Sequence, residues 1–131
     1  MVIDTSALVA IIIGEDERPI FEDLILRTPV VVMSVVSVVE ASIALLSKRP
    51  TYDAKLLEET ISSLRIDVRP VDLNQGSLAR TAFLQYGRGR SPARLNFGDC
   101  FAYALAKARD DTLLFKGEDF PRTDIVAAWR P

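Results

Sequence analysis

The chain lacks histidine altogether and has one cysteine, Cys100, among its 131 residues. Without an imidazole, the protein cannot use a Ser-His or Cys-His hydrolytic pair, and it cannot hold a histidine-ligated zinc ion. A single cysteine excludes an intrachain disulfide framework and is typical of a reducing compartment, so we expect a cytoplasmic protein. The chain also lacks a G-x-x-x-x-G-K-[ST] run, which excludes a Walker-type nucleotide site.

Long apolar segments are scarce as well. The longest, residues 30–46, is short for a membrane span and is interrupted by Ser34, Ser37, Glu40 and Ser42. It indicates a buried strand followed by a buried helix. The chain begins with Met1 and continues into apolar residues without a cationic region, so we expect no signal peptide and no membrane association.

The chain is neither long nor strongly charged. A chain of 131 residues fits one domain, so we expect residues 1–131 to fold as a single unit. The net charge of −2 does not predict nucleic-acid binding, and any such binding must come from local charge.

Apolar segments of strand length alternate with segments of helical patterning. We expect strands at residues 1–4, 30–34, 67–71 and 112–115, with a further candidate at 125–128. We expect helices at residues 5–13, 19–27, 37–48, 53–65, 74–86 and 96–109. This alternation predicts an α/β fold with a central, mostly parallel sheet flanked by helices on both faces.

Four acidic residues stand where apolar segments give way to turns or helix starts. Asp4 ends the first expected strand, and Glu40 lies alone within an apolar run. Asp99 lies in the first turn of an alanine-rich helix, and Asp119 follows a late strand. Because ligands of open parallel sheets bind beyond the carboxyl ends of the strands, acids far apart in the sequence can meet there.

Each acid also has a purely structural interpretation. Asp4 can cap a helix, and Glu40 can close a capping box with Ser37 in the run S-V-V-E. Asp99 suits the dipole of a helix start, and Asp119 can be a solvated loop residue beside Glu118. These alternatives stay open for each residue taken alone.

Taken together, the acids predict a cation site. Clustered carboxylates repel one another, so they either take up protons or recruit a cation. Oxygen ligands favour Mg²⁺ or Mn²⁺, with one or two carboxylates binding directly and waters completing the coordination. Such a site hydrolyses phosphodiester bonds without a nucleophilic side chain.

Four sequence blocks carry a family resemblance: M-V-I-D-T-S-A-L at residues 1–8, S-V-V-E at 37–40, L-N-F-G-D-C at 95–100 and L-L-F-K-G-E-D-F at 113–120. In this order and spacing the chain resembles the PIN-domain ribonucleases and, within them, the VapC toxins of bacterial toxin–antitoxin pairs. The resemblance extends over essentially the whole chain. It implies a PIN-like fold and metal-dependent endonucleolytic cleavage of RNA.

The resemblance also implies roles for individual residues. Asp4 and Asp99 match the acids that bind the metal, and Glu40 matches the third acid. Asp119 matches the fourth, although Glu118 is an adjacent alternative. Thr5 or Ser6 would lie near a metal-bound water. The implied partners are RNA, a cognate VapB-type antitoxin and a second copy of the toxin in a homodimer.

The loop at residues 86–94 has three arginines and no acid, and it leads into the helix that bears Asp99. Arginine forks suit phosphate oxygens, so Arg88 and Arg90 are candidates to hold RNA or an acidic antitoxin segment. Lys116 is a further candidate beside the fourth acid. The structural alternative is a solvated surface loop.

Two other functions compete with the nuclease. One is a PIN-like module that holds RNA or protein without catalysis, its acids serving as helix caps. The other is a phosphatase or phosphorelay receiver, which would need an Asp-x-Asp or an early acidic pair where Asp4 is followed by Thr5 and Ser6.

Overall fold

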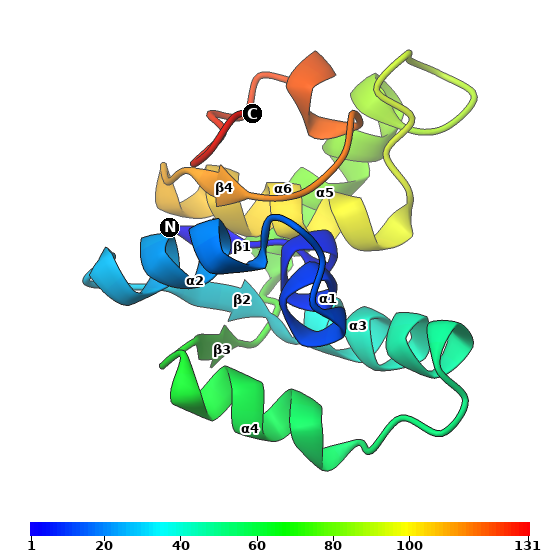
Figure 1. Cartoon of the computed structure of the whole chain (residues 1–131). Helices are drawn as coiled ribbons and strands as arrows, with labels where there is room; N and C mark the ends of the chain where they lie inside the picture. Colours follow the sequence, from blue (N-terminus) through cyan, green and yellow to red (C-terminus); the bar gives the residue numbers. More distant parts are fainter.

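The computed structural model describes residues 1–131 and has a four-stranded sheet at its centre. All three strand pairs are parallel, in the order β3-β2-β1-β4. The strands are β1 (Val2–Ile3), β2 (Val32–Ser34), β3 (Asp67–Arg69) and β4 (Leu113–Leu114). This architecture confirms the predicted α/β fold (Figure 1). The candidate strand at 125–128 is reduced to one bridge between Leu113 and Ala127.

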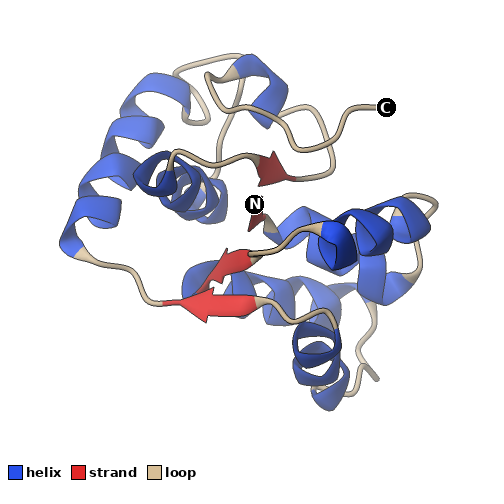
Figure 2. Cartoon of the chain, turned by 90° about the vertical axis from the view of Figure 1, so that its left-hand side faces the viewer, coloured by secondary structure: helices blue, strands red, loops and turns tan.

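Helices lie on both faces of this sheet, as the view in Figure 2 shows. Because side chains alternate along a strand, Ile3 and Met33 join the apolar cluster under α1 to α4. Val2 and Val32 join the second cluster, under α5 and α6. The helices are α1 (Thr5–Ile13), α2 (Arg18–Arg27), α3 (Val35–Lys48), α4 (Lys55–Ser63), α5 (Leu73–Tyr86), α6 (Phe97–Arg109) and the short 3₁₀ helix η1 (Phe120–Arg122).

Helix α1 begins and ends at the residues that the sequence predicts. Asp4 caps its start, and Gly14 ends it in the left-handed conformation, with φ of 77°. The β-branched residues of α1 are poor helix formers, yet nearly all of its side chains are buried. Packing against the sheet therefore outweighs local propensity here.

Helix α3 begins earlier than the sequence predicts. Ser34, not Ser37, is its N-cap, and the Ser34 hydroxyl accepts a hydrogen bond from the Val36 amide. This excludes the alternative interpretation of Glu40, a capping box with Ser37. Ser37 lies fully buried inside the helix instead, which leaves Glu40 available for another partner.

The C-terminal segment returns across the molecule. Trp129 packs edge-on against Phe21 of α2, with ring centroids 5.3 Å apart. The hydroxyl of Tyr103, on α6, donates a 2.7 Å hydrogen bond to Asp124. None of the helices is both long and apolar enough to span a membrane.

Candidate active site

A cavity of about 260 Å³ lies at the carboxyl end of β1, where α1 begins. Its walls come from α1, α3, the start of α6 and the segment after β4. All four acids singled out in the sequence line this cavity, namely Asp4, Glu40, Asp99 and Asp119. The parallel sheet thus gathers carboxylates from four distant stretches of the chain, and none of them forms an ion pair with lysine or arginine.

Asp4 is the most deeply buried of these acids. Its Oδ2 accepts hydrogen bonds from the amide and the hydroxyl of Ser6, at 2.8 and 2.5 Å. Its Oδ1 is buried and has no hydrogen-bond partner. Burial raises the pKa of Asp4 to about 6, against the opposing effect of the Ser6 hydrogen bonds and with a smaller contribution from the negative charge of Glu40.

Asp99 is held at the start of α6 by a capping box. Its Oδ2 accepts a 2.7 Å hydrogen bond from the Asn96 amide, and its own amide donates to Asn96 Oδ1 at 2.9 Å. Burial, followed by the negative charge of Asp4, raises the pKa of Asp99 to about 7. The helix dipole favours an anion here, but desolvation and the neighbouring carboxylates outweigh it.

The structural and the functional interpretations of Asp4 and Asp99 are therefore compatible. In each carboxylate, Oδ2 takes part in helix capping, which fixes the orientation of the side chain. Oδ1 of Asp4 is buried without a hydrogen bond, and the hydrogen bond that holds the Asp99 carboxylate engages its Oδ2. Two carboxylates held in this way offer two oriented oxygens to a cation.

Glu40 is positioned by tertiary contacts. Its Oε2 accepts a 2.5 Å hydrogen bond from the Thr5 hydroxyl, whose oxygen also lies 3.2 Å from the carbonyl oxygen of Ser37. Its carboxylate lies against Gly98, where a β-carbon would overlap it. Gly98 therefore makes room for Glu40 between α3 and α6.

The structure distinguishes the two adjacent acids after β4. Asp119 lines the acidic cavity, whereas Glu118 lines a separate hollow beside the C-terminal segment. Both residues are exposed. Of the two, Asp119 is therefore the one placed to act with Asp4 and Asp99.

Lys116 links the cavity to the loop after α1. Its backbone amide donates a 2.9 Å hydrogen bond to the Ser6 hydroxyl, which in turn donates to Asp4. Its ammonium group forms ion pairs with Glu15 and Glu17, at 2.8 and 2.7 Å. In this conformation the Lys116 side chain is bound to acids, although the residue lines the cavity.

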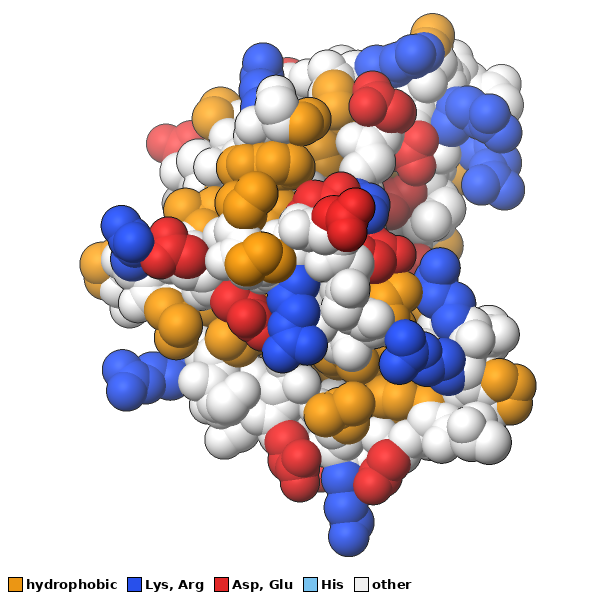
Figure 3. Space-filling model, in the orientation of Figure 1, with side chains coloured by type: hydrophobic (Ala, Val, Ile, Leu, Met, Phe, Trp, Pro, Cys, Tyr) orange, Lys and Arg blue, Asp and Glu red, His pale blue; other side chains and the backbone are white.

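The arginine-rich loop does not line the acidic cavity. Arg88 and Arg90 are exposed and form no ion pair, and the loop is closed at its base by pairing between Gly87 and Leu95. Lys and Arg side chains gather where this loop projects at the upper right of the molecule, and acidic side chains lie to their left and lower left (Figure 3). The loop thus forms a basic flank to an acidic centre.

Sequence reasoning missed two polar residues that line the cavity, Asn96 and Lys48. Asn96 precedes Asp99 by three residues, which is the spacing of a capping box. Lys48 follows Glu40 by eight residues, and residues spaced by four share a helix face. Helical spacing from Glu40 would have placed Lys48 on the cavity.

The residues present fit a small, hard cation. No group of three or more acidic or cysteine side chains lies close enough together to bind an ion jointly. Mg²⁺ does not need such a group, because it is usually bound by one or two carboxylates and keeps several waters. The unpartnered, buried Oδ1 of Asp4 beside Asp99 meets that requirement.

Comparison with known proteins shows the family of this chain. The PIN domain family matches residues 1–126. The chain is 42% identical to Ribonuclease VapC of Mycolicibacterium smegmatis over 127 residues, covering 97% of this chain and 98% of that protein. It is 41% identical to Ribonuclease VapC28 of Mycobacterium tuberculosis over 129 residues, covering 98% and 97%.

A solved structure agrees with the fold. The crystal structure of Mycobacterium tuberculosis VapC20, described as a toxin that cleaves the sarcin-ricin loop, superposes with a TM-score of 0.74. The match covers 99% of this chain and 98% of that one, at 18% identity. The chain therefore belongs to the PIN-domain family and, within it, to the VapC ribonucleases.

Proposed function

We propose that this protein hydrolyses RNA phosphodiester bonds endonucleolytically with a divalent cation, Mg²⁺ or Mn²⁺, bound by Asp4 and Asp99. The observation that carries the proposal is the buried and unpartnered Oδ1 of Asp4 in a cavity whose acids have no cationic partner. An unpaired buried carboxylate is costly, and a bound cation would remove that cost. Membership of the VapC ribonucleases supports RNA as the substrate.

The residues around the proposed cation have separate roles. When bound, the cation would lower the pKa of a water molecule and neutralise charge on the phosphate. Ser6 and Asn96 hold Asp4 and Asp99 in orientation through hydrogen bonds to Oδ2. Glu40, oriented by Thr5, and the exposed Asp119 line the cavity and would accept hydrogen bonds from waters around the cation.

Basic residues around the cavity would hold the RNA backbone. Arg88 and Arg90 are exposed and form no ion pair. Lys116 would reach a phosphate after exchanging its pairs with Glu15 and Glu17. Because these contacts are electrostatic, Arg88→Glu with Arg90→Glu should weaken RNA binding and flatten its dependence on salt.

We also propose that this protein is the toxin of a pair, with a VapB-type antitoxin and a second copy of itself as partners. Helix α3 supports a protein partner, because four of its apolar side chains are between 41% and 62% exposed. They are Val35, Val39, Ile43 and Leu46, which follow one another along the helix at the spacing of a single stripe. Ile43→Glu should lower the molar mass in solution or the affinity for the antitoxin. If neither changes, the stripe binds neither a second copy nor the antitoxin.

The decisive test is RNA cleavage with and without metal. The purified protein should cut single-stranded RNA with Mg²⁺ or Mn²⁺ and lose this activity in excess chelator. Asp4→Asn keeps the size of the side chain and removes its charge, so it should abolish cleavage while the far-ultraviolet circular dichroism stays unchanged. Asp23→Asn, on the exposed face of α2, is the matched control and should cleave as the parent does.

The same test separates the enzyme from a non-catalytic module. If the protein is a non-catalytic module, the parent and Asp4→Asn should bind RNA with equal affinity. Neither should cut RNA, whether metal is present or absent. Cleavage that survives both the chelator and Asp4→Asn would show that the active site lies elsewhere.

A further inference from the structure

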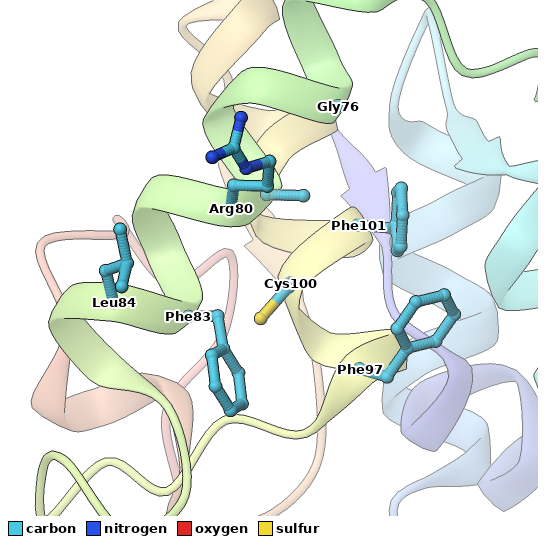
Figure 4. A pocket seen from close by; sticks show the side chains of 8 residues that line it. Gly76, Arg80, Phe83, Leu84, Phe97, Cys100 and Phe101 are labelled. Carbon is cyan, nitrogen blue, oxygen red and sulfur yellow. The ribbon is translucent and has the colours of Figure 1, made fainter.

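An apolar hollow of about 540 Å³ lies between α5 and α6, and Phe83, Phe97 and Phe101 are among the residues that line it (Figure 4). It shares no lining residue with the acidic cavity. Phe97 is 72% exposed, and exposed rings of this kind mark a protein contact, so this face suits the second copy of the chain proposed above. Contacts to RNA beside the cation must come from the walls of the acidic cavity itself.

Helix α3 contributes three residues to the wall of the acidic cavity, Glu40, Ala44 and Lys48. Residues spaced by four lie on one face of a helix, so these three form a single column along α3. Side chains of a helix lean toward its N-terminus, so the stem of Lys48 leans back over the turn that holds Ala44. One wall of the cavity thus leads from a carboxylate to an ammonium group.

Lys48 has no ionic partner within the chain. The residue is exposed and belongs to none of the ion pairs. A favourable acid on the same helix would stand four positions earlier, and that position is Ala44. Residues 41–52 contain no acidic residue at all. The ammonium group of Lys48 is therefore available to an anion from outside the chain.

The neighbouring basic residues are already bound. Lys116, the other lysine that lines the acidic cavity, forms ion pairs with two glutamates. Arg49, next to Lys48, donates a 3.1 Å hydrogen bond to the carbonyl of Ile13 and so ties the end of α3 to the end of α1. Of the two lysines on the cavity, only Lys48 can take a ligand without first breaking an ion pair.

We propose that Lys48 binds an RNA phosphate next to the one that is cleaved. This inference rests on the ribonuclease function proposed above. Glu40 and Lys48 are eight residues apart, so their backbones are separated by about 12 Å along the axis of α3. A strand whose cleaved phosphate lies at the cation, beside Asp4 and Asp99, therefore presents a neighbouring phosphate to Lys48. The acids repel that phosphate, and the ammonium group offsets the repulsion.

The test measures binding separately from cleavage. Fluorescence anisotropy with a short, fluorescein-labelled oligouridine, in chelator so that the RNA stays intact, gives the affinity at several salt concentrations. Cleavage of the same oligouridine with Mg²⁺ or Mn²⁺ gives KM and kcat. The parent is compared with Lys48→Gln, which removes the charge, and with Lys48→Arg, which keeps it. Lys55→Gln is the matched control, because Lys55 is an exposed and unpaired lysine that does not line the acidic cavity.

Lys48→Gln should weaken binding of the oligouridine by about 3- to 10-fold, as expected for the loss of one exposed, charge-assisted contact. The slope of log affinity against log salt should become shallower by about 0.7, the value for one phosphate of a single strand. KM should rise by the same factor as the affinity falls. Lys48→Arg should bind as the parent does, and Lys55→Gln should change neither the affinity nor the slope.

The inference fails if Lys48→Gln binds as tightly as the parent with the same salt slope, which is the result expected of a lysine that only balances the charge of the acids. It fails if Lys55→Gln loses as much affinity, because the effect would then come from overall charge. A fall in kcat with KM unchanged would place Lys48 on the cleaved phosphate and overturn its assignment to a neighbouring one.

The two measurements keep this inference apart from the ribonuclease proposal. If the parent cuts RNA and Lys48→Gln keeps the affinity and the KM of the parent, only the role of Lys48 is excluded. If the parent cuts no RNA with either metal, the ribonuclease proposal itself fails, whereas the anisotropy separately reports whether Lys48 contacts RNA.

Discussion

The two ends of α6 lie beside carboxylates in opposite electrostatic settings. At its start, Asp99 is buried beside Asp4 with no cation in contact, and its pKa is raised to about 7. Near its end, Lys107 pairs with Asp124 at 3.0 Å, and Tyr103 donates to the same carboxylate. Burial alone would raise the pKa of Asp124, but these hydrogen bonds lower it below its usual value.

The difference in partners distinguishes acids that stabilise the fold from acids that are available to bind a ligand. Asp124 gains its partners from within the chain and ties the C-terminal segment to α6. Asp4 keeps one buried oxygen without a partner, and burial raises the pKa of both Asp4 and Asp99, so their ionised forms cost stability in the metal-free protein. Removing the charge of Asp99 should therefore lower activity without lowering stability, whereas removing the charge of Asp124 should lower stability slightly without lowering activity.

The largest expected effect is on activity. Asp99→Asn should lower the rate of RNA cleavage by about 100- to 1000-fold, because it removes a carboxylate that acts at the charged centre. It should leave the stability of the metal-free protein equal or higher, because a buried charge disappears. Asp124→Asn should cleave normally and lose about 1 kcal/mol or less of stability, since its ion pair is largely exposed.

Initial cleavage rates and urea denaturation of the three proteins test this contrast. Equal loss of activity in both variants, or a marked loss of stability in Asp99→Asn alone, would contradict the distinction between the two ends of the helix.

The second effect concerns pH. The pKa values of Asp4 and Asp99 are raised to about 6 and about 7 in the folded chain from an ordinary value of 3.8. Between those limits the folded state binds more protons than the unfolded state, so the free energy of unfolding falls as pH rises from about 4 to about 7. The fall should be on the order of a few kcal/mol without metal.

Urea titrations across this pH range, with and without Mg²⁺, provide the measurement. Mg²⁺ at about 100 times its dissociation constant should restore about 2.7 kcal/mol at pH 8. Asp99→Asn should show a shallower pH dependence and little response to Mg²⁺. A parent protein whose stability rises through the same range would refute the predicted sign.

The smallest effect tests how Glu40 is placed. A β-carbon at position 98 would overlap the carboxylate of Glu40, which can move away because it is the end of a flexible side chain. Gly98→Ala should therefore preserve the fold but lower cleavage by about tenfold, as expected when an outer carboxylate is displaced. Gly76→Ala in α5, where nothing lies within 4 Å of the new methyl group, is the control for the gain in helix propensity.

Steady-state cleavage by Gly98→Ala, compared with that by Glu40→Gln, gives the readout. If Gly98→Ala cleaves as the parent does while Glu40→Gln does not, the close packing of Gly98 has no role in placing Glu40.

Local signals in the sequence predict much of this molecule. The capping residue Asp4 and the left-handed Gly14 define α1 at both ends, and the strand pattern predicts the parallel sheet. Sheet topology then explains why Asp4 and Asp99, far apart in the chain, line one cavity.

The parts that local signals miss depend on tertiary contacts. Valines fill the strand and the helix start around Ser34 and Ser37 alike, so propensity does not reveal which serine is the cap. The contact of Glu40 with Gly98 and the pairing of Lys116 with Glu15 join residues from different elements. Only the packed chain brings these groups together.

Trp129, the only tryptophan in the chain, provides an intrinsic optical probe. Its ring packs on Phe21 and lines no part of the acidic cavity. Emission from this indole should therefore shift when the C-terminal segment detaches from α2, and it should respond little to substitutions at the acids. A single fluorophore of natural origin can thus follow unfolding in every variant without added dyes.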